Sequence, residues 1–537
     1  MRFLTRKRSG TFAHTGGGRW GRRAVAAAAT TFFLWGAGAC DSDDGDDAPA
    51  ADCTKQCQAA NGAHFVCRKS DGQCVSLLSD NCREVLGDDT SDDAVILGSI
   101  FTTTSDNPSA ALVGVSIHNG LVMAMEEFPA EGLPPLRPGG KRRPLVFVGC
   151  DDRSEVSVAV AAAKHLAETV QVPAVLGFNN SSLLIQAARQ AAVPNNTLVL
   201  GAISEANEIS TLDDNNLVWR MSGRVAALSE AIAAFTPQLE QEVKQRFGVT
   251  TVKAATLYNG GAYGKDYFDT LKPLLTINGA PALSQVESGN YVDFNYGDPT
   301  DEMANPTDYG TAITRVLQAK PHIVYLLGHF ETGDNILRPI EEQWAALSPQ
   351  PAHRPYYIIS GAASPTAVPV IGNNDDLRRR IIGAANQTIT PAWEKYVQKY
   401  NARFAGDSTR PHLGGAGAYD GVFALAYLIT ALGELPLTGP NLAGQFARLM
   451  GGTPLETGPA NLELGYQIIQ SGGTLDLFGA HGYDDFNLQN GDGVQDVQFE
   501  CYPRDPSTRL ALPPLSSGLS YDLKTKTFKG AEGPQCQ

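Results

Sequence analysis

The sequence predicts an α/β protein with doubly wound parallel sheets, each covered by helices on both faces. After residue 93, short apolar runs alternate with segments whose apolar residues recur at helical spacing. Parallel strands need helical connections, and strands buried on both faces are apolar throughout. The alternation occurs as two series, before and after an extended run at 217–222. Two such series predict two similar lobes.

The first series begins with the apolar run AVILGSIF at 94–101. Further strands are expected at 144–150, 173–176 and 197–201, and helices at 113–128, at 156–166 and after Ser182. The second series begins with an amphipathic helix along 228–243, which Pro237 is expected to kink. Strands are then expected at 252–258, 322–328 and 356–360, and helices at 313–319, 393–404 and 419–432.

The composition favours a soluble globular protein with an acidic surface. The chain has 537 residues, of which 43% are hydrophobic and 18% charged, and its net charge is −15. An acidic chain repels phosphate backbones, so we expect no nucleic-acid partner. Motifs for nucleophilic hydrolases, zinc proteases, nucleotide-binding loops and dinucleotide folds are missing, and we expect no catalytic residues and no cofactor. Asn490–Gly493 is interpreted as a turn rather than a calcium loop.

The N-terminus has the order of an export signal. Seven basic residues and no acidic one occur before residue 40, followed by the apolar stretch Ala24–Trp35 and small residues that end at Cys40. This order resembles a bacterial lipoprotein signal, which implies that residues 1–39 are removed and that Cys40 is lipidated. The protein is then expected to be exported and anchored by lipid to a bacterial membrane, facing the periplasm or the cell surface. Plain secretion is the alternative.

Eight further cysteines predict disulfides, because their number is even and the chain is exported. The acidic segment 40–52 is interpreted as a tether, and residues 53–82 as a small module that disulfides must stabilise. We expect Cys53, Cys57, Cys67 and Cys74 to pair among themselves, Cys82 to pair with Cys150, and Cys501 to pair with Cys536. No CxxC pair occurs, so we expect no metal site.

A polar turn at 177–182 is the strongest candidate for a binding site. It lies between the apolar run that ends at Leu176 and the helix that begins with Leu183. Ser181 and Ser182 are expected to cap this helix, and free backbone N–H groups at a helix N-terminus can hold an anion such as a carboxylate. An ordinary helix cap is the alternative interpretation.

Several motifs in a fixed order resemble the type I periplasmic solute-binding proteins, in particular the branched-chain amino-acid/amide group. They are the turn at 177–182, Val218–Arg220, the Tyr263-Gly264 pair, the junction 318–325 and the Ala-Tyr-Asp start of a helix at 418–420. The resemblance covers roughly residues 93–495. It implies two lobes joined by three crossovers, with the ligand in the cleft between them. The expected lobes are 93–217 with about 383–480, and 218–382 with about 481–537.

The resemblance also implies roles for four residues. Ser181 matches the serine that bonds a ligand carboxylate, with the backbone at Ser182 assisting, and Tyr263 matches the tyrosine that packs on the ligand. Either Ser204 or Glu205 takes the place of the family threonine. The family acid that pairs with a ligand amine is missing from 361–364. Glu331 is a possible substitute, but we expect it to be an exposed residue at a helix start.

The expected function is therefore capture of a small polar ligand, with a carboxylate as one candidate group, for ABC-type transport through a membrane permease. Ligand sensing or surface interaction without transport is the alternative, since the cysteine-rich module offers a surface for a partner. A hydrolase based on Ser181 is a remote alternative, because no histidine motif accompanies the serine.

Overall fold

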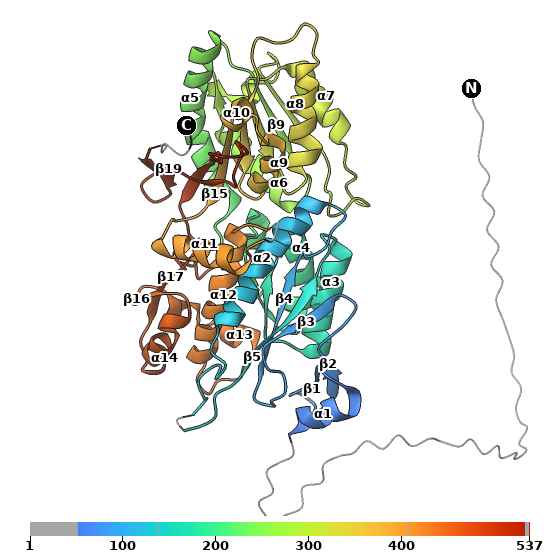
Figure 1. The fold of residues 1–537 in the computed structure, drawn as a ribbon, viewed down its shortest axis with the longest axis vertical. Helices are drawn as coiled ribbons and strands as arrows, with labels where there is room; N and C mark the ends of the chain where they lie inside the picture. The colour runs from blue at the N-terminus through green and yellow to red at the C-terminus, as the bar shows by residue number, and fades with distance from the viewer. Residues whose placement is uncertain (1–51, 138, 407–408, 532–535, 537) are drawn as a thin grey trace, which may run out of the picture. The chain divides into compact units, whose positions relative to one another are not determined.

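The computed structural model describes residues 52–536 except 138, 407–408 and 532–535 (Figure 1). The expected signal segment, Cys40 and almost all of the acidic tether lie outside the described residues. The described chain is an α/β fold built around a six-stranded and an eight-stranded sheet. It confirms the alternation of strands and helices predicted from the sequence.

The first sheet has the strand order β3-β5-β4-β6-β7-β8. Its strands are β3 (Cys82–Leu86), β4 (Val95–Phe101), β5 (Leu145–Asp151), β6 (Ala174–Gly177), β7 (Leu198–Gly201) and β8 (Val218–Arg220). All are parallel except β3, which is antiparallel to β5. The extended run at 217–222 thus contributes β8, the last strand of this sheet.

Helices cover both faces of the first sheet. On one face, α2 (Pro108–Glu127) packs against α12 (Leu413–Ala431), and on the other face lie α3 (Val156–Lys164) and α4 (Ser181–Ala187). By length and composition alone, α2 and α12 could each cross a membrane, but the apolar window of α12 is entirely buried in the core and more than half of that of α2 is buried. The same lobe contains α11 (Pro391–Arg403), α13 (Gly439–Ala443), α14 (Leu462–Gln470), β16 (Thr453–Glu456) and β17 (Leu475–Phe478).

The second sheet has the order β12-β9-β13-β14-β15-β18-β19-β20. The parallel strands are β9 (Ala254–Tyr258), β12 (Tyr291–Asn295), β13 (Ile323–Leu327), β14 (Tyr356–Ser360) and β15 (Ile381–Asn386). The antiparallel strands are β18 (Val497–Cys501), β19 (Leu515–Asp522) and β20 (Thr527–Gly530). We expected a parallel sheet, but this one is mixed. The chain returns from the first lobe beside the carboxyl end of β15, so β18 has to run back along β15.

The helices of the second lobe also lie on both faces of its sheet. They are α5 (Val225–Phe247), α6 (Ala262–Leu274), α7 (Tyr309–Ala319), α8 (Arg338–Ala345), α9 (Val368–Ile371) and α10 (Asp375–Arg378). The helix α5 continues through Pro237. A two-stranded ribbon, β10 (Thr276–Ile277) with β11 (Ala280–Pro281), follows α6.

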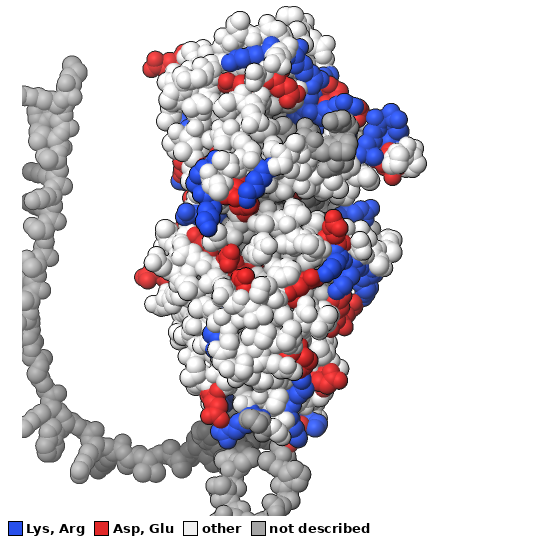
Figure 2. All heavy atoms as spheres, turned by 90° about the vertical axis from the view of Figure 1, so that its left-hand side faces the viewer, with Lys and Arg blue, Asp and Glu red and all other residues white. Residues whose placement is uncertain are grey.

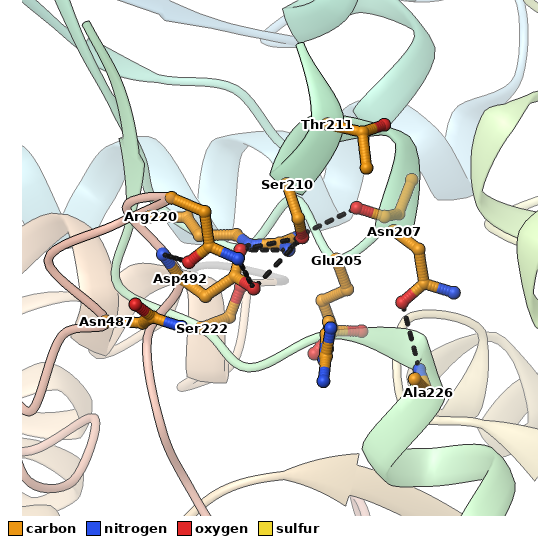
Figure 3. Close-up of polar contacts among 12 residues, drawn as sticks. Glu205, Asn207, Ser210, Thr211, Arg220, Ser222, Ala226, Asn487 and Asp492 are labelled. Atoms are coloured by element: carbon orange, nitrogen blue, oxygen red, sulfur yellow. Dashed lines mark hydrogen bonds and ion pairs between the residues drawn. The ribbon is translucent and has the colours of Figure 1, made fainter. Parts of the chain in front are cut away.

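Three segments connect the two lobes, after β8, after β15 and before β18. The first and third are joined by polar contacts around Arg220 and Asp492 (Figure 3). Strand pairing places β8 with the first sheet and all of β15 with the second, whereas the expected boundaries lay at 217/218 and near 383.

The N-terminal module is a helix and a hairpin joined by disulfides. The helix α1 (Cys53–Asn61) is linked to β1 (Phe65–Cys67) by Cys53–Cys67 and to β2 (Cys74–Ser76) by Cys57–Cys74. Two more disulfides, Cys82–Cys150 and Cys501–Cys536, join β3 to β5 and fasten the end of the chain to β18. All eight cysteines pair as expected, and β3 in addition extends the first sheet.

Candidate functional site

A polar cavity of about 560 Å³ lies between the two lobes. One wall consists of loops that follow β4, β5 and β6, and the other of loops that follow β12 and β13. Ligands of open α/β sheets bind beyond the carboxyl ends of the strands, which is the position of this cavity in both sheets. Its polar lining includes Thr104, Asn107, Ser154 and Asn180 from the first lobe, and Thr300, Tyr309, His329 and Glu331 from the second.

Acidic side chains outnumber basic ones around this cavity. Four carboxylates line it, and the single guanidinium among the lining residues is that of Arg153. The imidazole of His329 is neutral near pH 7, because burial lowers its pKa to about 4. The lining therefore favours a ligand with an ammonium group or several hydrogen-bond donors. The four carboxylates are Asp106, Glu155, Glu302 and Glu331.

Glu331 is buried at the floor of this cavity, and our expectation of an exposed residue is wrong. Its side chain is only 2% exposed. The carboxylate oxygen Oε1 accepts hydrogen bonds from the Tyr296 hydroxyl at 2.5 Å, the His329 backbone N–H at 3.0 Å and the Asn259 amide at 3.3 Å. The chain turns at 329–332 before the next helical segment begins at Gly333, and this turn directs the carboxylate inward. An acid is thus present at a strand end in the second lobe.

The helix after the 177–182 turn is capped by Asn180, not by the serine pair. The Asn180 side chain accepts from the backbone N–H groups of Ser182 at 2.8 Å and Leu183 at 3.4 Å. Asparagine is among the best N-cap residues, since its short amide reaches the free N–H groups of the first turn. In the sequence, this asparagine stands directly before Ser181 and Ser182, the pair that we expected to cap the helix.

The hydroxyl of Ser181 organises the neighbouring loop. It is 1% exposed and accepts hydrogen bonds from the backbone N–H groups of Glu205 and Ala206, both at 3.1 Å. In that loop, the Ser204 hydroxyl donates to the Phe178 carbonyl at 3.3 Å. The structure thus brings Ser181 together with the loop that contains Ser204 and Glu205.

Ser182 and Tyr263 lie where the two lobes meet. The Ser182 hydroxyl accepts from the backbone N–H of Ala262 at 3.0 Å, which links α4 of the first lobe to α6 of the second. Tyr263 is 2% exposed and its ring lies 4.4 Å from that of His329. In the described part of the chain, neither the Tyr263 hydroxyl nor either ring nitrogen of His329 has a hydrogen-bond partner. Buried polar atoms without partners are uncommon in folded proteins.

The residues predicted to bind the ligand, Ser181, Ser182, Ser204 and Tyr263, are not among those that line the cavity. Asn180, which precedes Ser181 in the sequence, and His329, whose ring contacts that of Tyr263, line it instead. Sequence reasoning missed His329 and the inward orientation of Glu331, because both depend on the turn after β13. Among the described residues, no group of three or more His, Cys, Asp or Glu side chains is placed to hold a metal ion.

The model of the family described as "Periplasmic binding protein" matches residues 97–462. The chain belongs to the periplasmic binding protein family. The matched region includes both walls of the cavity. It excludes the cysteine-rich module and the segment after residue 462.

Solved structures of other periplasmic binding proteins share the fold at low identity. A leucine-binding protein, LivK, from Thermotoga maritima is 16% identical, with a TM-score of 0.54, 82% of this chain and 99% of that chain covered. A solute-binding protein of an ABC transporter from Rhodopseudomonas palustris, in complex with 3,4-dihydroxybenzoic acid, is 15% identical, with a TM-score of 0.56 and coverage of 80% and 98%. LivJ from Streptococcus pneumoniae, in complex with isoleucine, is 14% identical, with a TM-score of 0.54 and coverage of 79% and 99%. No curated protein matches the sequence.

Proposed function

We propose that this protein captures a small polar ligand in the cleft between its lobes and delivers it to an ABC-type membrane permease. The observation that carries the proposal is the polar cavity at the carboxyl ends of both sheets, between lobes joined by three crossovers. Closure about crossovers of this kind encloses a ligand, and a permease can then distinguish the loaded form from the empty one. The named neighbours include a branched-chain amino acid transporter substrate-binding protein in complex with isoleucine and an ABC transporter solute-binding protein in complex with 3,4-dihydroxybenzoic acid.

The proposed ligand carries an ammonium group or an equivalent donor that faces Glu331. The three hydrogen bonds that Glu331 accepts hold its carboxylate in one orientation at the cavity floor. A carboxylate on the same ligand would be directed toward Arg153 and the polar residues Ser154 and Asn180 of the opposite lobe. Ser181, Ser182, Ser204 and Tyr263 are proposed to act behind these groups, as residues that position the loops of the site.

Contacts between the lobes give closure a structural basis. The hydrogen bond from the Ala262 N–H of the second lobe to Ser182 of the first lobe crosses the cleft, and the ring contact between Tyr263 and His329 lies within the second lobe beside it. A ligand that bridges Asn180 and Glu331 would add contacts across the same cleft and stabilise the closed arrangement.

Lipid anchoring at Cys40 and export of the mature chain belong to this proposal and rest on the sequence order of the N-terminus. The acidic segment 40–52 is proposed as the tether between this anchor and the module at 53–82. The two lobes are proposed as 93–217 with about 383–480 and 218–382 with about 481–537, adjusted so that β8 belongs to the first lobe and all of β15 to the second.

Ligand sensing without transport is the second candidate. The disulfide-bonded module and the C-terminal segment, both outside the family match, favour it because each adds surface that ligand capture does not need. A permease encoded beside this gene would support transport, and its absence would support sensing. The hydrolase alternative receives no support: the described contacts of the Ser181 hydroxyl are to two backbone N–H groups and not to a histidine.

Mass spectrometry of small molecules released from the purified protein tests the proposal. We expect one small polar compound with an amino group, and calorimetry with that compound should show one-to-one binding that Glu331→Gln weakens at least tenfold. Glu302→Gln is the matched control, because Glu302 lines the same cavity near its exposed rim. A ligand that binds both variants equally well would place the site elsewhere.

A further inference from the structure

A second cavity, of about 440 Å³, lies next to the crossover that follows β15. Both lobes line it. Leu112 and Val113 of α2 and the stretch 410–413 come from the first lobe, and the loop after β14 comes from the second. The chain segment 505–516, which follows β18 and includes the first two residues of β19, closes it. This closing segment lies outside the region that matches the family.

Most of the wall of this cavity is apolar. Besides the α2 residues, it includes Ile203, Val368 and the indole of Trp393, and the closing segment adds Leu510 and Leu512. Both of these leucines are exposed on their outer sides. The cavity is therefore different in character from the polar cavity, and suits the apolar body of a small molecule.

The floor of the second cavity is polar. Glu205 and Glu500 both reach it, together with the amide of Gln387. In the described structure, the Glu500 Oε2 atom and the Gln387 Nε2 atom are buried without a hydrogen-bond partner. The Glu205 carboxyl does have a hydrogen-bond partner, because its Oε1 accepts from the Asn386 amide at 2.8 Å.

The two carboxyl groups are held in place by their surroundings. Glu500 lies on β18 opposite Gly383 of β15, and a Cβ atom at Gly383 would come within 2.6 Å of Glu500 Oε2. The glycine therefore leaves room for this carboxyl group. Burial raises the pKa of Glu205 to about 7, and Glu500 contributes to that shift by repulsion. Burial also raises the pKa of Glu500 to about 7.

We propose that this cavity is a second binding site, for a small apolar molecule that carries one ammonium group. The ammonium donates to Glu500 Oε2 beside Glu205, and the apolar body lies between α2 and the closing segment. A cation at this floor supplies the partner that a buried carboxylate needs, whereas an anionic head group would be repelled by two carboxyl groups.

Other charged groups in the lining do not reverse this preference. Arg410 donates to its neighbouring carbonyl at Thr409, 2.6 Å away, and Asp505 adds a third carboxylate. His412 is neutral near pH 7, because burial lowers its pKa to about 4. Acidic groups thus exceed basic ones on this lining as well.

An occupant of this site would hold the two lobes together. The closing segment is fastened to the second lobe, since the Ala511 N–H donates to the Gly372 carbonyl at 2.7 Å and Cys501 is bonded to Cys536. The helix α2 belongs to the first lobe. A molecule between them favours the arrangement of the lobes seen here, so its binding is coupled to closure of the cleft.

A matched set of probes tests the proposal: 2-phenylethylamine, 2-phenylethanol and phenylacetate, each titrated into the purified protein at pH 7.5. Calorimetry gives the affinity, and Trp393 fluorescence reports occupancy of this cavity, with Trp393→Phe abolishing the signal. We expect the amine to bind at least tenfold more tightly than the alcohol, and phenylacetate not to bind. Glu500→Gln should lower the amine affinity at least tenfold and leave the alcohol unchanged.

Two further variants separate the possible results. Leu112→Trp fills the cavity from a helix position that is 40% exposed, so the fold tolerates the larger side chain. This variant should block binding of the amine, and it provides a test even where Glu500→Gln fails to fold. Glu331→Gln alters only the polar cavity and should leave amine binding unchanged. The proposal is overturned if the three probes bind alike, if none binds, or if Glu331→Gln rather than Leu112→Trp abolishes amine binding.

Discussion

Arg220 at the end of β8 is hydrogen-bonded to Asp492 in the third crossover, 272 positions further along the chain. The Nε and Nη2 atoms of Arg220 lie 3.0 and 2.5 Å from Asp492 Oδ1, and both side chains are buried (Figure 3). Ser210 bonds to both partners, and the Ala206 carbonyl accepts a further hydrogen bond from Arg220 at 2.7 Å. This network fixes two of the three connections between the lobes relative to each other.

Asp492→Asn should strongly destabilise the protein. Removing one partner of a buried ion pair leaves an uncompensated charge, which costs about 3–5 kcal/mol of unfolding free energy. Chemical denaturation followed by circular dichroism measures the change. Asp334→Asn is the control, since Asp334 forms an exposed pair with Arg338 one helical turn away and should cost less than about 1 kcal/mol. Equal effects of the two substitutions would show that the buried network does not stabilise the crossovers.

Ser181→Ala should lower stability as well as ligand affinity. The family resemblance matched this residue to a serine that bonds a ligand carboxylate, but its hydroxyl is buried and accepts from two backbone N–H groups. Leaving buried donors without an acceptor costs about 1–3 kcal/mol. Thermal unfolding measures this, with Ser109→Ala on the partly exposed start of α2 as the control. An unchanged melting temperature would contradict a role for Ser181 in organising the 204–206 loop.

Ser182→Ala should act on closure rather than on either lobe. The substitution removes the acceptor for the Ala262 N–H, and with it one hydrogen bond between the lobes, worth about 0.5–1.5 kcal/mol. We expect a larger average radius of gyration by small-angle X-ray scattering, with the melting temperature changed less than in Ser181→Ala. If the variant scatters like wild type but melts at a lower temperature, Ser182 stabilises its own lobe and does not control closure of the cleft.

The alternation of strands and helices and the presence of disulfides were accessible from the sequence because each depends on local signals. Apolar runs bounded by turns mark strands, and an even set of cysteines in an exported chain implies disulfides. The orientation of Glu331 was not accessible, since a strand followed by a helix does not reveal the turn between them. The antiparallel run of β18 to β20 was missed for a related reason: it depends on where the third crossover re-enters the second lobe.

Choosing Ser181 and Ser182 as the helix cap was a different kind of error. Serine and asparagine have similar cap preferences, so composition at 179–182 does not decide which residue starts the helix. The structure decides it, because Asn180 is extended and its side chain bonds the first turn. That one-residue shift explains why the predicted serines lie behind the cavity and their neighbour lines it.

Glu500→Gln should change how stability depends on pH. The folded protein holds a proton on Glu500 up to about pH 7, whereas an unfolded glutamate releases it near its ordinary value of 4.5. The folded state therefore binds more protons between these values, and this contribution to stability is present at low pH and lost as the pH rises to 7. Glu205, which also lines the second cavity, acts in the same direction. In melting curves, the variant should lose more stability relative to wild type at pH 5 than at pH 8, and a constant difference would contradict the shift.

Replacing Cys501 and Cys536 together by serine should loosen the end of the chain without unfolding the first lobe. The bond spans 35 positions, and closing a loop of this size stabilises a protein by about 2–4 kcal/mol. Because the closed loop contains the segment 505–516 that covers the second cavity, limited proteolysis should cut the double variant there first. The Cys53→Ser, Cys67→Ser double variant is the control, since it opens the N-terminal module and leaves the C-terminal segment attached. Equal proteolysis between 505 and 516 in the two double variants would show that contacts such as that of Ala511 with Gly372, rather than the disulfide, hold the segment in place.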